Sequence, residues 1–121
     1  MNRKLAAYRR GHAGESLAAL WLRLKGYRIL ARRLKTRAGE IDLVAAAPFG
    51  PVCFIEVKAR AAARIAAESV GLSQQTRIAR AACLYLASRP HLSRRGSRFD
   101  IVAIVPRRLP VHLRDVWQPD F

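Results

Sequence analysis

Four charged side chains occupy positions where the surrounding residues predict buried β-strands. Asp42 lies within Ile-Asp-Leu-Val and Glu56 within Phe-Ile-Glu-Val, and Glu40 and Lys58 follow at alternate positions of the same two strands. The chain has only 8 acidic residues against 23 basic ones, so acids inside strands are unexpected for a solvated surface. Two carboxylates and a lysine, in a protein that is otherwise strongly basic, are the components of a metal-assisted site for phosphodiester hydrolysis.

The spacing of these residues depends on a predicted β-hairpin. Residues 40–46 and 52–59 are rich in Ile, Val, Leu and Phe, and the segment between them has the composition of a hairpin loop. With Phe49 at the centre of the loop, positions whose numbers sum to 98 are cross-strand partners. Asp42 therefore opposes Glu56.

Alternation along the strands places Glu40, Asp42, Glu56 and Lys58 on one face. Because directly opposed carboxylates destabilise a sheet, we expect Lys58 and a divalent cation, Mg²⁺ or Mn²⁺, to compensate the Asp42/Glu56 pair. The alternative is a purely structural ion-pair network on a solvated face. A lysine favours the catalytic interpretation, since 19 of the 23 basic residues are arginine and an ammonium group can donate or lose a proton.

The remaining sequence predicts an α/β fold with a mixed sheet flanked by helices, in the order α-β-β-β-α-β-β. The first helix, residues 13–25, has an apolar stripe and enough further apolar residues to be packed on more than one face. The stripe consists of Leu17, Leu20, Trp21 and Leu24. Ser73 is the expected N-cap of the second helix. The other expected elements are a strand at 27–34, a loop at 60–72, a helix at 73–88 and strands at 98–105 and 111–116.

Length and charge restrict the class of protein. The 121 residues correspond to a single domain, in which residues 1–11 are a basic N-terminus that we expect to be flexible. The net charge of +15 predicts nucleic acid as the partner, ahead of an acidic membrane surface or protein. The longest apolar run, residues 17–22, is too short for a membrane helix or a signal peptide, so we expect a cytoplasmic protein with no membrane partner.

The cysteines and histidines indicate no reactive site. Cys53 and Cys83 are expected to be buried, and no catalytic or metal-binding role is assigned to the three histidines.

The motifs of this chain resemble those of the YraN family of small bacterial proteins, within the PD-(D/E)xK nuclease superfamily that includes restriction enzymes and archaeal Holliday-junction resolvases. The likeness extends from His12 to Phe121. It rests on Gly14-Glu15, Gly26-Tyr27, Gly39-Glu40-Ile41-Asp42-Leu43, Glu56-Val57-Lys58-Ala59-Arg60 and Arg98-Phe99-Asp100-Ile101-Val102.

The resemblance implies a restriction-endonuclease-like core in which Asp42 and Glu56 bind the metal. Lys58 would position or activate the attacking water. Glu15 on the first helix would be a further catalytic acid that reaches over the same site, while the residues themselves leave a simple helix-dipole contact equally open.

Other positions qualify the resemblance. Glu40 matches the family signature and would support Lys58 or Arg60. Gln74 stands where the family usually has a lysine, and its amide can still hydrogen-bond a phosphate or water. Asp100 matches a strand motif of the family and is expected to pair with Arg98 or with a helix end.

The expected function is that of a divalent-metal-dependent DNA endonuclease, with branched, nicked or damaged DNA suggested by the likeness to resolvases. The alternative is a catalytically silent nucleic-acid-binding module that keeps the nuclease fold. A basic ribosome- or nucleoid-associated protein ranks last, because such a protein needs no cluster of acidic residues. A homodimer is compatible with the sequence but does not follow from it. The expected nucleic-acid contacts are Arg32, Arg33, Arg37, Arg60, Arg64, Gln74 and Arg77.

Overall fold

The computed structural model describes residues 3–119, and the side chains of residues 12–119. A five-stranded sheet in the order β1-β2-β3-β4-β5 forms the middle layer. Neighbouring strands are antiparallel except β3 and β4, which are parallel. The strands are β1 (Arg28–Thr36), β2 (Gly39–Ala46), β3 (Val52–Ala59), β4 (Ser97–Ile104) and β5 (Val111–Leu113).

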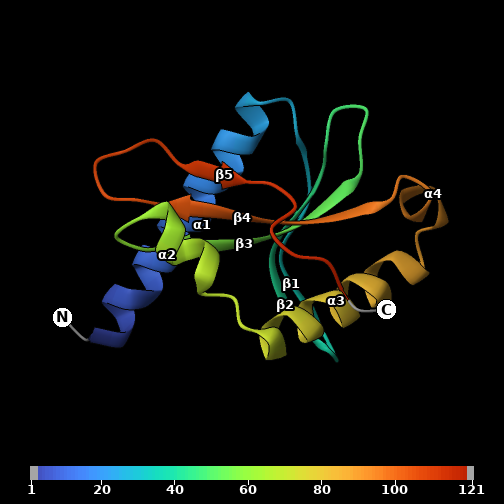
Figure 1. The fold of residues 1–121 in the computed structure, drawn as a ribbon, viewed down its shortest axis with the longest axis horizontal. Coiled ribbons are helices and arrows are strands. Elements are labelled where there is room, and N and C mark those ends of the chain that lie inside the picture. The colour runs from blue at the N-terminus through green and yellow to red at the C-terminus, as the bar shows by residue number, and fades with distance from the viewer. Residues whose placement is uncertain (1–2, 120–121) are drawn as a thin grey trace.

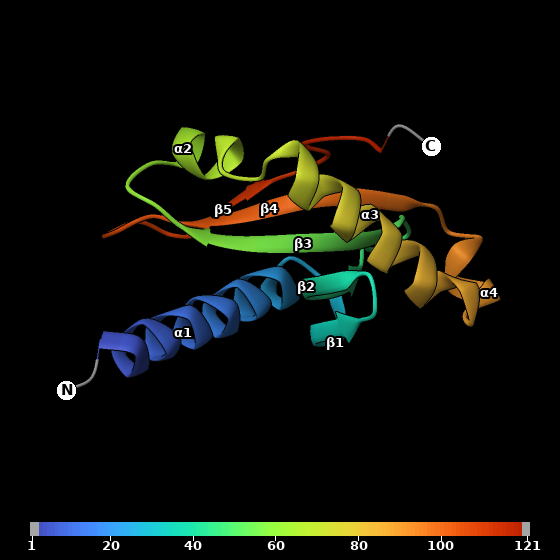
Figure 2. The ribbon, with the colours of Figure 1, turned by 90° about the horizontal axis from the view of Figure 1, so that it is seen from below.

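Helices cover both faces of the sheet. They are α1 (Arg3–Leu24), α2 (Ala63–Glu68), α3 (Leu72–Ala87) and α4 (Pro90–Ser93). The last three connect β3 to β4, since a parallel pair needs a crossover connection (Figure 1). Figure 2 shows α1 beneath the sheet and α2 and α3 above it. The predicted fold class is confirmed: this is an α/β protein whose mixed sheet and flanking helices agree with a restriction-endonuclease-like core.

The sheet separates two hydrophobic cores because β3 is apolar on both faces. Val52 and Phe54 face the core formed with α3, whereas Cys53 and Ile55 face the core formed with α1. All four side chains are at most 1% exposed. A strand buried on both sides reads as a continuous hydrophobic run, which explains why a single glutamate within it is conspicuous.

The orientation of α1 differs from the prediction. Ala18, Ala19 and Leu22 face the sheet, whereas Leu17 and Leu24 of the predicted apolar stripe are 41% and 72% exposed. The expectation of packing on more than one face is therefore wrong for the described part of α1. The small side chains of Ala18 and Ala19 let the helix lie close to the sheet, and Leu17, Leu20 and Leu24 are left exposed on the outer side. Within residues 3–119, no helix is both long and apolar enough to cross a bilayer.

Four smaller differences concern single elements or residues. The helix α1 begins at Arg3, well before the predicted start, and the segment predicted as a loop contains the short helix α2. The N-cap of α3 is Gly71 rather than Ser73, and it makes no side-chain capping bond. Cys53 is buried as expected, but Cys83 is exposed because it lies on the outer face of α3.

Candidate functional site

The predicted hairpin register is confirmed where the two strands pair. Leu43 pairs with Ile55, and the ladder continues regularly from there to the loop. Beyond Leu43 and Ile55 no further backbone pairs join β2 to β3, so the strands separate at the level of Asp42 and Glu56 (Figure 1). The Asp42 Oδ2 atom accepts a hydrogen bond of 2.8 Å from the Val57 N–H. A side-chain carboxylate thus satisfies a donor that the ladder leaves unpaired.

Glu56 is the more enclosed of the two acids. Only 5% of its surface is exposed, and its Oε1 atom has no hydrogen-bond partner among the described residues. The amide of Gln74 on α3 lies 3.5 Å from the other carboxylate oxygen, which is the outer limit for a hydrogen bond. A buried carboxylate oxygen without a partner is costly, and such an atom marks a place where a further group can bind.

The two carboxyl groups perturb each other. Burial is the largest cause that raises the pKa of Glu56, and repulsion from Asp42 adds to it. Burial also raises the pKa of Asp42, although the hydrogen bond from Val57 opposes this. The interaction with Asp42 raises the pKa of Glu56, whereas the interaction with Glu56 opposes the rise in the pKa of Asp42. The charge of Lys58 lowers the pKa of both acids.

Glu15 approaches the pair from α1. Its charge raises the pKa of Asp42, and its own side chain is only 13% exposed. Its Oε2 atom accepts a hydrogen bond of 2.6 Å from the Arg33 Nε atom. Arg33 has a φ of 49°, which is uncommon for a residue with a long side chain. This ion pair, together with the uncommon backbone conformation of Arg33 in β1, holds the Glu15 carboxylate near Asp42.

A polar hollow of about 270 Å³ opens beside Asp42. Besides Glu15, Arg33 and Asp42, it is lined by His12, Lys35, Glu40 and Ile41. His12 and Lys35 were not among the residues predicted for the site. The sequence offered only one hint, because His12 is the first residue of the resemblance to the YraN family. Lys35 reaches the hollow because it pairs with Glu40 across β1 and β2.

The residues present fit a divalent cation of the hard type. Among the described residues, no group of three or more His, Cys, Asp or Glu side chains is placed to hold a metal. One or two carboxylates are sufficient for Mg²⁺, however, because water and substrate phosphate oxygens complete its coordination. Asp42 and Glu56 supply two adjoining carboxylates, and the Glu56 Oε1 atom is without a partner in the described part of the chain.

The residues predicted to contact nucleic acid fall into three groups. Arg37 and Arg77 are exposed near the turn between β1 and β2, where a side chain added at Gly39 would meet the Arg77 Cβ atom at 3.3 Å. Arg60 and Arg64 are exposed at the end of β3 and on α2. The third group lies closer to the acids and is engaged within the protein: Arg32 donates to Ser16, Arg33 to Glu15 and Gln74 to Glu56.

Two further predicted residues are placed by the structure. Glu40 is exposed and pairs with Lys35, and no contact with Lys58 or Arg60 is found among the described residues. Asp100 lies on the face of the sheet toward α1, away from Glu56, and the expected pairing with Arg98 is confirmed by two hydrogen bonds of 2.9 and 2.8 Å.

Asp100 has two more donors that the sequence did not indicate, the His112 ring and the Asp115 N–H. Burial by itself would raise the pKa of Asp100, but these hydrogen bonds and the Arg98 guanidinium lower it to about 2. The group is therefore a structural anchor for the C-terminal segment.

Comparison with known proteins identifies the family that this chain matches. A model of the family described as "Uncharacterised protein family UPF0102" matches residues 14–104, which include all four residues predicted to be catalytic. A UPF0102 protein of Parvibaculum lavamentivorans is 54% identical over 115 residues, covering 95% of this chain and 86% of its own length. A UPF0102 protein of Agrobacterium fabrum is 53% identical over 116 residues, covering 96% of this chain and 94% of its own length.

Proposed function

This chain belongs to UPF0102, the uncharacterised family whose YraN motifs it carries, and from its acidic site we propose that it is a divalent-metal-dependent endonuclease that hydrolyses phosphodiester bonds in DNA. One observation carries this proposal. The half-buried carboxyl group of Asp42 adjoins the buried carboxyl group of Glu56 where β2 and β3 separate, and the Glu56 Oε1 atom has no partner among the described residues. Without a ligand such an arrangement costs stability, so a binding role accounts for its presence better than a structural one.

Each residue of the site has a distinct role in this proposal. Asp42 and Glu56 would hold the cation, and Gln74 would orient the Glu56 carboxylate from α3. When bound, the divalent cation supplies positive charge that polarises the phosphodiester and makes water more acidic. Lys58, on the same face as Glu56, donates hydrogen bonds that position the attacking water or a phosphate oxygen. Glu15 remains paired with Arg33, which fixes its carboxylate at the edge of the hollow.

The reaction is a simple hydrolysis. A water oxygen attacks the phosphorus atom, the bond to one ester oxygen breaks, and that oxygen leaves as a hydroxyl group after it takes up a proton. The products are a strand with a terminal phosphate and a strand with a terminal hydroxyl. The net charge of +15 supports a nucleic-acid substrate, because basic residues that neutralise phosphates release counterions on binding. Branched, nicked or damaged DNA is the substrate class that we propose.

A catalytically silent nucleic-acid-binding module is the second candidate. It is favoured by the contacts of Gln74 and Val57, which already satisfy part of the acidic pair without any cation. In that case Asp42 would serve only to hold β2 and β3 together. The two candidates predict the same affinity for DNA and differ in the effect of metal and in turnover.

The test is incubation with linear, nicked, single-stranded and four-way DNA in Mg²⁺ and in Mn²⁺. We expect cleavage of at least one of these by the wild type, and a loss of at least about 100-fold in rate for Lys58→Ala. Lys58→Arg is the matched control, because it keeps the charge for binding but replaces the compact ammonium group. We expect it to bind DNA normally and to cleave poorly. Tight binding with no cleavage of any of the four DNAs in either metal would leave the silent module as the function.

A further inference from the structure

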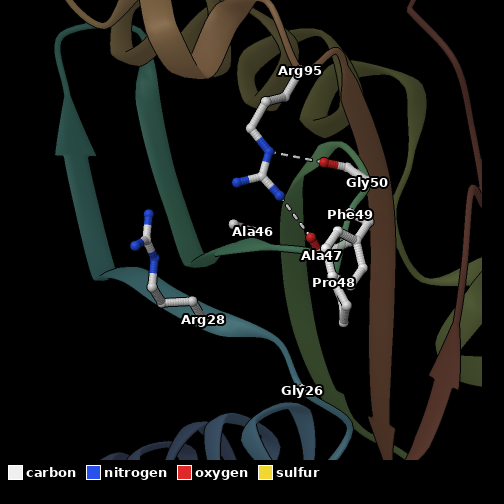
Figure 3. Close-up of a pocket in the computed structure, with 8 residues that line it drawn as sticks. All are labelled: Gly26, Arg28, Ala46, Ala47, Pro48, Phe49, Gly50 and Arg95. Carbon is white, nitrogen blue, oxygen red and sulfur yellow. Dashed lines mark hydrogen bonds between the residues drawn. The ribbon is translucent and has the colours of Figure 1, made fainter.

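A second nucleic-acid contact is indicated at the opposite end of the hairpin. The loop of residues 47–51 borders an open hollow of about 560 Å³, shown in Figure 3. Arg28 of β1 and Arg95 after α4 line it together with Phe49, and no acidic residue does. Phe49 and Asp42 are seven residues apart in sequence, which corresponds to roughly 20 Å along a strand. The hollow is therefore separate from the acidic site.

Both the exposure and the backbone conformation of Phe49 are unfavourable for a phenylalanine. Its side chain is fully exposed, at 109% of the reference surface, and its φ of 52° lies in the left-handed region. That region costs an L-residue with a Cβ atom roughly 1–2 kcal/mol, and glycine or asparagine would occupy it more readily. Burial cannot account for a phenylalanine here, so a partner that contacts the ring is the more economical explanation.

The loop that presents this ring is rigid. Arg95 donates hydrogen bonds to the Gly50 and Ala47 carbonyl oxygens, at 2.9 and 2.7 Å. The Ala47 N–H donates to Pro51 at 3.0 Å, and the Gly50 N–H donates to Ala47 at 3.2 Å. Figure 3 shows the Arg95 guanidinium held over the loop by the two bonds that it donates. A preformed loop loses little entropy when it binds a ligand.

Two guanidinium groups face the hollow with donors to spare. The Nη1 atom of Arg95 has no hydrogen bond to any described residue, and the same is true of the whole Arg28 guanidinium within residues 12–119. Free guanidinium donors recognise phosphate oxygens, and an exposed aromatic ring stacks on a nucleobase. A base in a duplex is already stacked on its neighbours, whereas an unpaired base has a face available.

We infer that this hollow binds one unpaired nucleotide of a nucleic-acid strand, with the base stacked on Phe49 and the phosphate held by Arg28 and Arg95. The inference uses the nucleic-acid partner of the proposed function but not the cleavage reaction. It gives the protein a means of recognising single-stranded or branched positions at a distance from the acidic pair. The unpaired nucleotide can belong to DNA or RNA, because the base and the phosphate are common to both.

The test measures binding in the presence of a chelator, where hydrolysis cannot contribute. The probes are a 12-nucleotide single-stranded DNA that contains 2-aminopurine, the RNA of the same sequence and the blunt DNA duplex. We expect Phe49→Ala to weaken binding to the single strands about tenfold, to abolish the change in 2-aminopurine fluorescence that stacking on Phe49 causes, and to change duplex affinity less than twofold. Whichever single strand shows the larger loss identifies the natural source. Phe49→Trp should retain the affinity.

Two controls separate binding from folding. Leu109→Ala removes a side chain that is 70% exposed in the loop between β4 and β5, at the other end of the sheet, and should change none of the affinities. Phe49→Gly should raise the melting temperature, because glycine accepts the positive φ, while it loses single-strand affinity like the alanine variant. The melting temperature and the single-strand affinity of Phe49→Gly thus change in opposite directions.

The outcomes that would overturn the inference are distinct from those that concern the proposed function. A wild type that binds the probes while Phe49→Ala binds the single strands equally well overturns only the role of this hollow. The same holds if Phe49→Ala leaves nucleic-acid affinity intact but changes the oligomeric mass in light scattering, which would make the loop a protein contact. A wild type that binds none of the three probes overturns the nucleic-acid partner itself.

Discussion

The Asp42 carboxylate accepts the backbone N–H of Val57 at 2.8 Å, at the point where β2 and β3 cease to pair. This single bond gives Asp42 two tasks, because it joins the strands and holds the carboxylate against Glu56. The two tasks can be separated by substitution.

Asp42→Asn should leave the stability of the metal-free protein unchanged or higher. The asparagine carbonyl can still accept from Val57, its NH₂ group can donate to Glu56, and the repulsion between two acids is removed. Asp42→Ala should instead destabilise the fold by about 1–3 kcal/mol, because the Val57 N–H loses its acceptor. Urea unfolding of both variants in a chelator measures the difference. An asparagine variant as unstable as the alanine variant would mean that the charge of Asp42 is structural.

The stability of the metal-free protein should depend on pH through Glu56. Its pKa in the fold is raised, chiefly by burial and then by Asp42, so the folded state binds more protons than the unfolded state above the ordinary pKa of 4.5. The stabilising contribution is complete below that value and is lost as the pH rises. Between about pH 5 and pH 8 the wild type should therefore lose stability relative to Glu56→Gln. Parallel profiles for the two proteins would show that Glu56 does not titrate in this range.

Asp100 should give the opposite dependence at acid pH. Its pKa is lowered to about 2, so its contribution is present above the ordinary value of 3.8 and is lost as the pH falls toward 2. Asp100→Asn should cost about 3 kcal/mol or more near neutral pH, because Arg98 and His112 lose a buried partner. Below about pH 4 the difference between wild type and variant should shrink. A constant difference across this range, measured by denaturant unfolding, would contradict the assignment.

Affinity for duplex DNA should fall steeply with salt. With a net charge of +15, we expect micromolar or tighter binding at low salt and a large loss between about 50 and 200 mM. Arg60→Gln should reduce the slope of log affinity against log salt by about 1. Arg23→Gln, an exposed arginine in the last turn of α1, is the matched control and should leave the slope unchanged. Affinity that hardly varies with salt would exclude a mode dominated by phosphate contacts.

Much of the acidic site was predictable because it depends on local rules. The loop centre and the alternation of side chains are enough to place Asp42 against Glu56, and the register between Leu43 and Ile55 confirms that arithmetic. The sequence could not show that backbone pairing ends at Leu43 and Ile55, because alternation and loop length carry no information on where a ladder ends. It therefore gave no sign that Val57 would donate to the Asp42 side chain.

Other features depend on tertiary contacts and were mispredicted or missed. Periodicity favours the large leucines of α1 as the core face, but the sheet instead accepts the smaller Ala18 and Ala19. The short helix α2 has too few residues for a periodic signal. The positive φ of Arg33, which directs its guanidinium to Glu15, is set by the surrounding fold and not by its residue type.

The most direct test of the acidic pair as a cation site is the melting temperature of wild type and Asp42→Asn, each with a chelator and with millimolar Mn²⁺. A ligand that binds only the folded state at about 100 times its dissociation constant stabilises it by about 2.7 kcal/mol, which is several degrees for a chain of this size. We expect Mn²⁺ to raise the melting temperature of the wild type by that order. We expect Asp42→Asn to melt at or above the wild type in the chelator and not to respond to Mn²⁺. If the melting temperature of the wild type does not respond to Mn²⁺, and Asp42→Asn is destabilised and also does not respond, the acidic pair is not a cation site.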